Sequence, residues 1–481
     1  MENESPTTPK HGCLPPWRVD ELPAPLPFSL ANALRTIGPG AILLVGAIGM
    51  GEWIAGPLFV VQNGRSVLWI ATVAFVLQSL LNLEAVRYTL YTGESALAGL
   101  MRLQPGPKVW GTVYALGAFA QLGLPAAAAG CAGVTFAIFN GRAPGGGDVG
   151  TVTWITVALV IMATLILASG RKVERLLERL SWMMILFIFG FLVWVNLTFV
   201  PMKDWGSTLA GFFQFGAIPE KVDFVMLAVF AALAGSGGIG NIAISSWFRD
   251  KGFGMASKTG NMGGVWSREH TLAPVGSVFP INAESLRRWR DWWRYAIIDQ
   301  SGLWMLGCIV GMFLMVNLAA SLFQPGMTIT GVAAGVFQAA EMKKLWAGFW
   351  ILGLMNGFWI LFSTTLTNVD VLTRVVTDIV WAGSPSAQKR PVGKIYGLLL
   401  LIFTIIAVFG AFVGDAKMLL LILGATAAPI NAFSALQLLR LNTTLLPQEL
   451  RPPMWRKLAL ILCALFYGAV SIAMFRQVFS L

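Results

Sequence analysis

The sequence predicts an all-α integral membrane protein of about eleven transmembrane helices, built as two inverted five-helix repeats with broken first and sixth helices. Composition is the first observation behind this fold class. Hydrophobic residues make up 56% of the 481 residues and charged residues only 12%, whereas soluble proteins have roughly 25% charged residues. The mean hydropathy of +0.71 is typical of a chain that lies largely in lipid. The other two observations are the number of apolar windows and the matching positions of two glycine-rich ones.

Eleven windows are apolar enough to cross a bilayer, which takes about 20 residues in a helix. A polar, proline-rich tail over residues 1–35 precedes them, and a loop over residues 248–295 separates the sixth window from the seventh. We expect the spans at residues 38–62, 67–91, 110–138, 151–169, 182–201, 223–247, 296–320, 346–377, 395–414, 417–439 and 457–479.

The distribution of basic residues predicts the orientation of these spans. Cytoplasmic loops carry an excess of Lys and Arg, and a cytoplasmic N-terminus puts 26 of the 34 basic residues on the inner side. We therefore expect a protein of the inner (plasma) membrane, with its N-terminus in the cytoplasm and its C-terminus outside. The net charge of +11 then reflects basic residues that face the anionic lipids of the inner leaflet. No nucleic-acid partner is needed to explain this charge. The basic residues on the outer side are Arg65, Arg142, Lys203, Lys221, Lys343, Lys344, Lys417 and Arg476.

The loop over residues 248–295 is the one sizeable segment outside the lipid. It ends in a stretch where Trp289, Trp292 and Trp293 alternate with arginines. Such a stretch is typical of a helix that lies on the membrane surface with tryptophan anchors. A gating or partner-binding loop is the alternative.

The first span is rich in glycine and carries a carboxylate, Glu52, near its middle. A carboxylate at the bilayer midplane costs ~2.5–3.5 kcal/mol on insertion scales. Glu52 is therefore expected to face a cavity or a ligand rather than lipid.

The sixth span has the same character at the matching position of the second set of five helices. A glycine-rich run over residues 235–240 precedes Asn241. A matched pair of glycine-interrupted spans is a pointer to a binding site between inverted repeats, so we expect unwound helices near 49–52 and 235–241 that face one another. Close helix packing through small residues is the alternative for either span. The candidate binding residues are Gly49, Met50, Gly51, Glu52, Gly237, Gly238 and Asn241.

A series of motifs along the first two spans points to a known family. The motifs are Gly38-Pro39, Gly64, Leu68-Trp69, Gln78, Arg87 and Thr92-Gly93.

This frame resembles the natural resistance-associated macrophage protein (Nramp) family of divalent-metal transporters. The resemblance implies a LeuT-like fold, with inverted repeats over residues 36–220 and 221–445 and an additional helix within residues 446–481.

The chain also departs from the family pattern at the expected binding site. The family's metal-binding Asp-Pro-Gly-Asn becomes Gly-Met-Gly-Glu over residues 49–52, and its Met-Pro-His becomes residues 237–239, Gly-Gly-Ile. The third span has Gln121 and no acid where proton-coupled members carry acidic residues. A standard manganese or iron importer is therefore not implied, and we expect weak coupling to protons.

Three further charged residues within the spans are candidates for gating or coupling. Glu84 and Arg87 are three residues apart, and Asp370 lies four residues before Arg374, so each pair can meet on one face of a helix. A simple neutralising ion pair is the alternative role for each.

Metal-binding clusters and enzyme active sites are not indicated. The four cysteines are far apart, without a CxxC pair, and the two histidines lie in polar segments. We therefore assign no disulfide, no cofactor and no enzymatic activity, and we treat the cysteines of apolar stretches as small hydrophobic residues.

The preferred function is a secondary transporter of a divalent cation, bound by Glu52, Asn241 and backbone carbonyls. Oxygen ligands favour Mg²⁺ or Mn²⁺ over softer metals. The alternatives are transport of an anion or a small organic solute, and a membrane-embedded enzyme or sensor that transports nothing.

Overall fold

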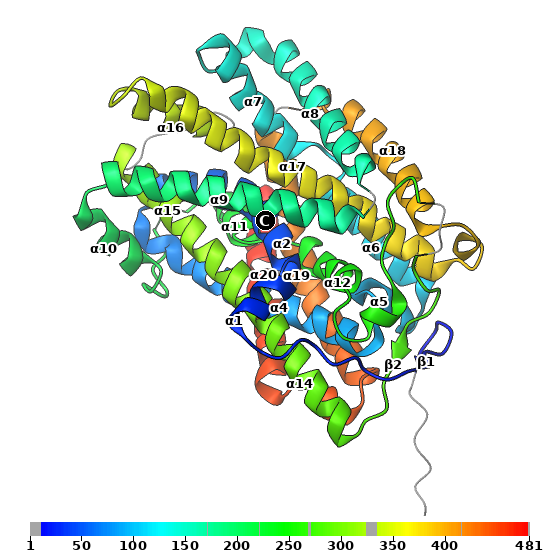
Figure 1. Cartoon of the computed structure of the whole chain (residues 1–481). Coiled ribbons are helices and arrows are strands. Elements are labelled where there is room, and N and C mark those ends of the chain that lie inside the picture. Colours follow the sequence, from blue (N-terminus) through cyan, green and yellow to red (C-terminus); the bar gives the residue numbers. More distant parts are fainter. Residues whose placement is uncertain are drawn as a thin grey trace, which may run out of the picture.

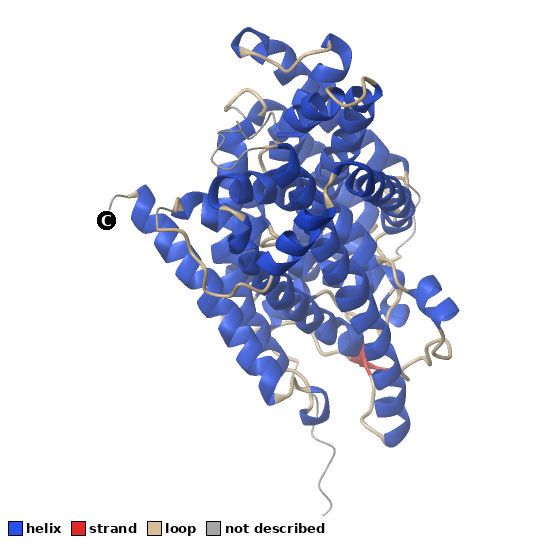
Figure 2. Cartoon of the chain, turned by 90° about the vertical axis from the view of Figure 1, so that its left-hand side faces the viewer, coloured by secondary structure: helices blue, strands red, loops and turns tan. Residues whose placement is uncertain are grey.

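The computed structural model describes residues 11–170, 172–220, 222–267, 271–323, 334–414 and 416–479. The first ten residues of the expected polar tail lie outside these ranges. The protein is a helical bundle crossed by the long helix α17 (Figure 1), and its described strands form one short parallel pair (Figure 2). The elements are β1 (Arg18–Val19), α1 (Leu30–Thr36), α2 (Pro39–Ala47), η1 (Ile48–Ala55), α3 (Gly56–Asn63), η2 (Arg65–Leu68), α4 (Trp69–Thr92), α5 (Ala96–Arg102), α6 (Pro107–Leu122), α7 (Ala126–Asn140), η3 (Gly146–Asp148), α8 (Val149–Ser169), α9 (Val173–Phe199), α10 (Met202–Gly211), α11 (Phe224–Leu233), α12 (Gly240–Lys251), α13 (Ala256–Thr259), β2 (Ser277–Val278), α14 (Ala283–Ile297), η4 (Ile298–Met305), α15 (Leu306–Leu322), α16 (Ala334–Lys343), α17 (Gly348–Gly383), η6 (Ala387–Lys389), α18 (Val392–Gly410), α19 (Ala416–Thr444), η7 (Gln448–Leu450) and α20 (Met454–Val478).

The predicted all-α membrane fold is confirmed. Among the described residues, ten helical segments are long and apolar enough to cross a membrane, and they coincide with ten of the eleven expected spans. One of them, the third span, consists of α6 and α7, with a non-helical break at residues 123–125. The remaining expected span, the sixth, is divided between α11 and α12. Continuous helices satisfy their own backbone hydrogen bonds in lipid, so the two divided spans, the third and the sixth, are the exceptions.

The interruption of the sixth span lies where the glycine run predicts it. Helix α11 ends at Leu233, α12 begins at Gly240, and the backbone between them is not helical. Gly235, Gly237 and Gly238 have φ angles of 97°, 59° and 58°. These left-handed conformations strain any residue with a Cβ atom, so the glycines are what allow the chain to turn here.

The first span differs from its prediction, because it is not unwound near residues 49–52. Its helix is continuous from Pro39 to Asn63, with a π-helical segment, η1, in the middle. The glycines serve close packing instead. A Cβ atom on Gly49 would lie 1.8 Å from Oγ1 of Thr364, and one on Gly51 would lie 1.8 Å from the carbonyl oxygen of Leu233. Close helix packing through small residues, the alternative interpretation of this span, therefore accounts for these two glycines.

We expect Gly51→Ala to destabilise the protein by about 1–3 kcal/mol, the usual cost of overpacking. The added methyl group meets the backbone of α11, which cannot rotate away as a side chain can. Gly190→Ala in α9 is the matched control, because a Cβ atom there has no neighbour within 4 Å. Thermal unfolding in detergent measures both variants, and equal melting temperatures would contradict the packing role of Gly51.

The loop between the sixth and seventh spans packs against the segment that precedes α1. Strand β1 pairs with β2 of this loop, and the N-terminal segment runs past α14 (Figure 1). Trp292 donates a hydrogen bond to the carbonyl of Pro23 at 2.8 Å. Trp289 is buried, stacks on Trp293 and lies near the Arg87 guanidinium. Packing within the protein, rather than anchoring in a membrane surface, therefore accounts for Trp289.

Candidate functional site

A small cavity lies between the first span and the interruption of the sixth. Its volume is about 30 Å³, which is enough for at least one water molecule, because a cavity needs about 10–15 Å³ on this measure to hold one. Helices α6, α17 and α19 complete its wall. The lining residues are Leu43, Gly46, Ala47, Met50, Gly51, Gln121, Leu122, Leu233, Gly235, Ser236, Gly237, Gly240, Thr364, Thr367, Asn368, Val371 and Leu423.

Glu52 does not line this cavity, but it forms a hydrogen bond to a residue that does. The side chain is fully buried, and its Oε1 accepts a hydrogen bond of 3.2 Å from the backbone N–H of Gly235, a cavity-lining residue. Its Oε2 has no hydrogen-bond partner among the described residues. A buried carboxylate without a counter-charge is unfavourable, so this group requires either a proton or a cation.

Gln78 of α4 supports the interruption of the sixth span. Its Oε1 accepts hydrogen bonds from the backbone N–H groups of Ser236 and Gly237 at 3.0 and 3.1 Å. Its Nε2 donates to the carbonyl of Ala234 at 2.7 Å and to the Tyr467 hydroxyl, also at 2.7 Å. One side-chain amide thus replaces helical hydrogen bonds that the interruption removes.

Gln121 and Asn241 complete this support. Gln121 of α6 accepts from the N–H of Ile239 at 2.9 Å and donates to the carbonyl of Gly237 at 3.0 Å. Asn241 donates to Gln78 at 3.0 Å and to Asn431 at 2.9 Å. Asn241 therefore belongs to an amide cluster and does not line the cavity.

We expect Gln78→Leu to destabilise the interrupted span by about 1–3 kcal/mol, because several buried backbone groups would lose their partner. Gln437→Leu is the control, since the Oε1 atom of Gln437 has no hydrogen-bond partner in the described structure. Thermal melts of the purified proteins measure the difference. If the two substitutions lower the melting temperature equally, Gln78 does not stabilise the interrupted span through these hydrogen bonds.

The residues predicted from the sequence do not form a single site. Met50, Gly51 and Gly237 line the cavity, and Glu52 reaches the interrupted span from behind it. Gly49 packs against α17, and Gly238 packs against Gln121. Sequence reasoning missed Gln78 and Gln121 as supports of the interruption. It also missed Thr364, Thr367 and Asn368, although their polar run in the eighth span was a usable signal.

Asp370 belongs to a buried ionic network that joins α12, α17 and α18. Arg374 binds Asp370 at 2.9 Å, as the spacing of the two residues predicts, and also Asp250. Asp370 further accepts hydrogen bonds from the Tyr396 hydroxyl at 2.7 Å and from the Trp247 indole at 3.0 Å.

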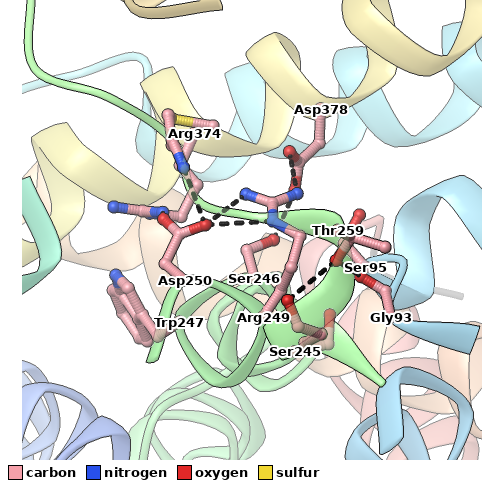
Figure 3. A network of polar contacts seen from close by, with 12 residues as sticks. Gly93, Ser95, Ser245, Ser246, Trp247, Arg249, Asp250, Thr259, Arg374 and Asp378 are labelled. Atoms are coloured by element: carbon pink, nitrogen blue, oxygen red, sulfur yellow. Dashed lines mark hydrogen bonds and ion pairs between the residues drawn. The ribbon is translucent and has the colours of Figure 1, made fainter. Parts of the chain in front are cut away.

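Arg249 extends this network toward a second aspartate on α17. Its guanidinium contacts Asp250 at 2.9 Å and Asp378 at 2.6 Å, and Ser246 also bonds to Asp378. Figure 3 shows these side chains converging from the end of α12 onto α17. The network thus joins two arginines to three aspartates, Asp250, Asp370 and Asp378.

Glu84 and Arg87 form the expected ion pair, at 2.7 Å. Arg456 of α20 also binds Glu84, at 3.0 Å, and Asn442 of α19 donates to the same carboxylate at 3.0 Å. Glu84 lies roughly 9 Å along α4 from Gln78 at 1.5 Å per residue. This second cluster therefore ties helix ends together, away from the cavity.

Asp299 of η4 holds the start of the first span. Its two carboxylate oxygens accept hydrogen bonds from the backbone N–H groups of Gly38 and Gly40, both at 2.7 Å. A carboxylate at a helix N-terminus is stabilised by the unpaired N–H groups and by the helix dipole. The first and seventh spans are thereby coupled.

A second small cavity lies next to the ionic network, outside the spans. Glu94 and Arg102 line it, and their side chains pair at 2.5 Å. Burial opposes ionisation of Glu94, but the hydrogen bonds and charge of Arg102 outweigh it and lower the pKa of this carboxyl. Both groups are thus charged and paired.

Within the described residues, no group of three or more His, Cys, Asp or Glu side chains is arranged to hold a metal ion. Any cation at the interrupted span would therefore be held by fewer side chains, together with backbone or amide oxygens. Glu52 is the carboxylate available there.

Comparison with known proteins identifies the fold. No family model matches the sequence, and no curated protein matches it significantly. A structure of the Eremococcus coleocola manganese transporter in complex with an aromatic bis-isothiourea substituted compound matches with a TM-score of 0.64, at 16% identity, over 95% of this chain and 90% of that one. This chain shares its fold. A structure of a variant of the same transporter matches with a TM-score of 0.61 at 15% identity, over 96% and 91% of the two chains. The LeuT-like architecture implied by the Nramp resemblance is thus supported along nearly the whole chain.

Proposed function

We propose that this protein is a secondary transporter that moves a divalent metal cation across the membrane by alternating access. The observation that carries the proposal is the cavity at the interrupted sixth span, together with the buried carboxyl of Glu52, which bonds to the cavity-lining Gly235 through Oε1 and has no hydrogen-bond partner at Oε2. In inverted-repeat transporters the substrate site lies between the repeats at such interruptions. The shared fold with a manganese transporter adds support.

The size and lining of the cavity favour a small cation over the alternatives. A volume of about 30 Å³ suits a small ion better than an organic solute. The lining residues include no lysine or arginine that would attract an anion. Hydroxyl, amide and backbone oxygens are ligands of hard ions, which makes Mg²⁺ and Mn²⁺ the first ions to test.

The two repeats would be residues 36–220 and 221–445, in the inner membrane with the N-terminus in the cytoplasm. Cys13 offers a test of this orientation, because it is the only cysteine of the chain that is not buried. A membrane-impermeant maleimide should label Cys13 in inside-out vesicles and not in intact cells. Labelling in intact cells would reverse the proposed orientation.

Uptake into proteoliposomes tests the function. We expect saturable uptake of Mn²⁺ or Mg²⁺ that persists without a pH gradient, because the third span has Gln121 and no acidic residue, and the two histidines lie in polar segments. Uptake that stops when the pH gradient is removed would contradict the expected weak coupling. A folded protein that transports no divalent cation, but does transport an anion or an organic solute, would refute the cation assignment.

A further inference from the structure

Three polar side chains that line the cavity of the interrupted span have no hydrogen-bond partner in the described structure. They are Ser236 at the interruption, and Thr367 and Asn368 on α17. The hydroxyl of Ser236 is buried, and Thr367 is only 4% exposed. A buried polar group without a partner costs about 1–3 kcal/mol. Unpaired groups gathered around one cavity therefore point to a ligand that pairs with them.

Thr367 differs from every other hydroxyl residue of α17. A serine or threonine within a helix commonly donates to the carbonyl of an earlier turn. Each of the others donates to a backbone carbonyl, namely Ser363, Thr364, Thr365, Thr373 and Thr377. Thr367 forms no such bond, so its hydroxyl is available at the cavity.

One face of α17 forms the wall of the cavity on the side of the eighth span. Thr364, Thr367, Asn368 and Val371 all line the cavity. Residues spaced by three and four positions lie on one side of a helix. Gly46 of the first span allows this face to approach, because a Cβ atom there would lie 2.7 Å from Cγ2 and 3.4 Å from Oγ1 of Thr367. The Thr367 hydroxyl thus lies next to the backbone of the first span.

The two residues that the sequence indicates as metal ligands are less well placed. Asn241 uses its amide in hydrogen bonds to Gln78 and Asn431, and it does not line the cavity. Glu52 does not line the cavity either, although its hydrogen bond to Gly235 keeps its carboxyl close. A charge in a buried place acts over such a distance because the dielectric is low. The oxygens that contact a bound ion must therefore come from other residues.

We propose that Ser236, Thr367 and Asn368 are the side-chain ligands of the transported cation, while Glu52 supplies negative charge nearby without being a ligand. The inference rests on the proposed function, because it names the ligands at the same site. Hydroxyl and amide oxygens are hard ligands, which suit Mn²⁺ and Mg²⁺. These oxygens bind through lone pairs and need not lose a proton, in agreement with the expected weak coupling to protons.

Two pairs of variants on α17 separate the ligands from their surroundings. Valine has the shape of threonine without its hydroxyl, so Thr367→Val is compared with Thr365→Val. Thr365 donates to the carbonyl of Leu361 and does not line the cavity. Asn368→Leu is compared with Asn356→Leu. Asn356 is fully buried, its amide also has no hydrogen-bond partner in the described structure, and it lies roughly 18 Å earlier along the helix at 1.5 Å per residue.

Calorimetric titration of the purified full-length protein with Mn²⁺ and Mg²⁺ tests the proposal. We expect Thr367→Val and Asn368→Leu each to weaken binding by at least about tenfold, since even indirect partners of metal ligands act on that scale. Thr365→Val and Asn356→Leu should bind as wild type does. Wild-type affinity in both cavity variants would overturn the proposal. An equal loss in the controls would also overturn it, because the loss would then not depend on the cavity.

Asn368→Asp distinguishes a ligand from a packing residue. It retains an oxygen at the same place and adds a negative charge, so it should bind Mn²⁺ at least as tightly as wild type. An affinity as low as that of Asn368→Leu would refute the role of Asn368 as a ligand.

The outcomes also separate this inference from the proposed function. Cation binding that depends on Thr367 and Asn368, without uptake of any divalent cation into proteoliposomes, would refute transport alone. Uptake of Mn²⁺ by the wild type, with unchanged affinity in both cavity variants, would refute the ligand assignment alone.

Discussion

Glu52→Gln is expected to abolish binding and uptake of divalent cations while the protein stays folded. Glu52 is the carboxylate at the interruption of the sixth span, and it is fully buried with one oxygen unpartnered. A neutral amide keeps the shape and can still accept the Gly235 N–H, so the packing survives. What is lost is the negative charge that offsets the desolvation of a cation. Calorimetric titration with Mn²⁺ and Mg²⁺ measures the loss directly.

Glu52→Asp serves as the matched variant. It keeps the charge but withdraws it by one methylene group, so it should weaken cation binding without eliminating it. If an anion or a neutral solute is the substrate, the order reverses and Glu52→Gln should bind that substrate at least as well as wild type. Equal cation binding by wild type and Glu52→Gln would remove the cation hypothesis at this site.

The membrane-spanning architecture could be predicted because lipid makes strict demands. Every spanning segment must satisfy its own backbone and present apolar side chains, so hydropathy alone locates it. The interruption of the sixth span could also be predicted from the sequence. Gly235, Gly237 and Gly238 lie within four residues of one another, which is more glycine than a helix tolerates without a conformational reason.

The first span shows where such reasoning stops. Gly49 and Gly51 look like the glycines of the sixth span in sequence, yet they keep helical conformations and allow close contact with α17 and α11. Glycine is required both where φ is positive and where another backbone approaches. The sequence cannot distinguish these two uses, because the deciding neighbour comes from a distant part of the chain.

The supports of the candidate site were hidden for a related reason. Gln78 and Gln121 are single neutral amides within apolar helices, and nothing periodic marks them. Their importance comes from the unpaired backbone groups they face, which exist only in the folded chain.

The buried ionic network of α12 and α17 differs from an ordinary surface salt bridge. Arg374 is fully buried and contacts Asp370 and Asp250, while Arg249 contacts Asp250 and Asp378. Removal of one member of such a network leaves a charge in low dielectric without its partner. The network thereby holds the second half of the interrupted span against α17, whose side chains line the cavity.

Arg374→Ala is expected to destabilise the protein by about 3–5 kcal/mol, the usual cost of breaking a buried ion pair by removing one partner. Asp370 would keep the Tyr396 and Trp247 hydrogen bonds but lose its counter-charge. Arg142→Ala is the control, because Arg142 pairs with Asp148 in an exposed place where solvent screens the charges, and it should leave stability close to wild type. Thermal unfolding in detergent compares the two variants. A melting temperature for Arg374→Ala equal to that of Arg142→Ala would mean that the network contributes no stability, and that α12 is held to α17 by apolar packing alone.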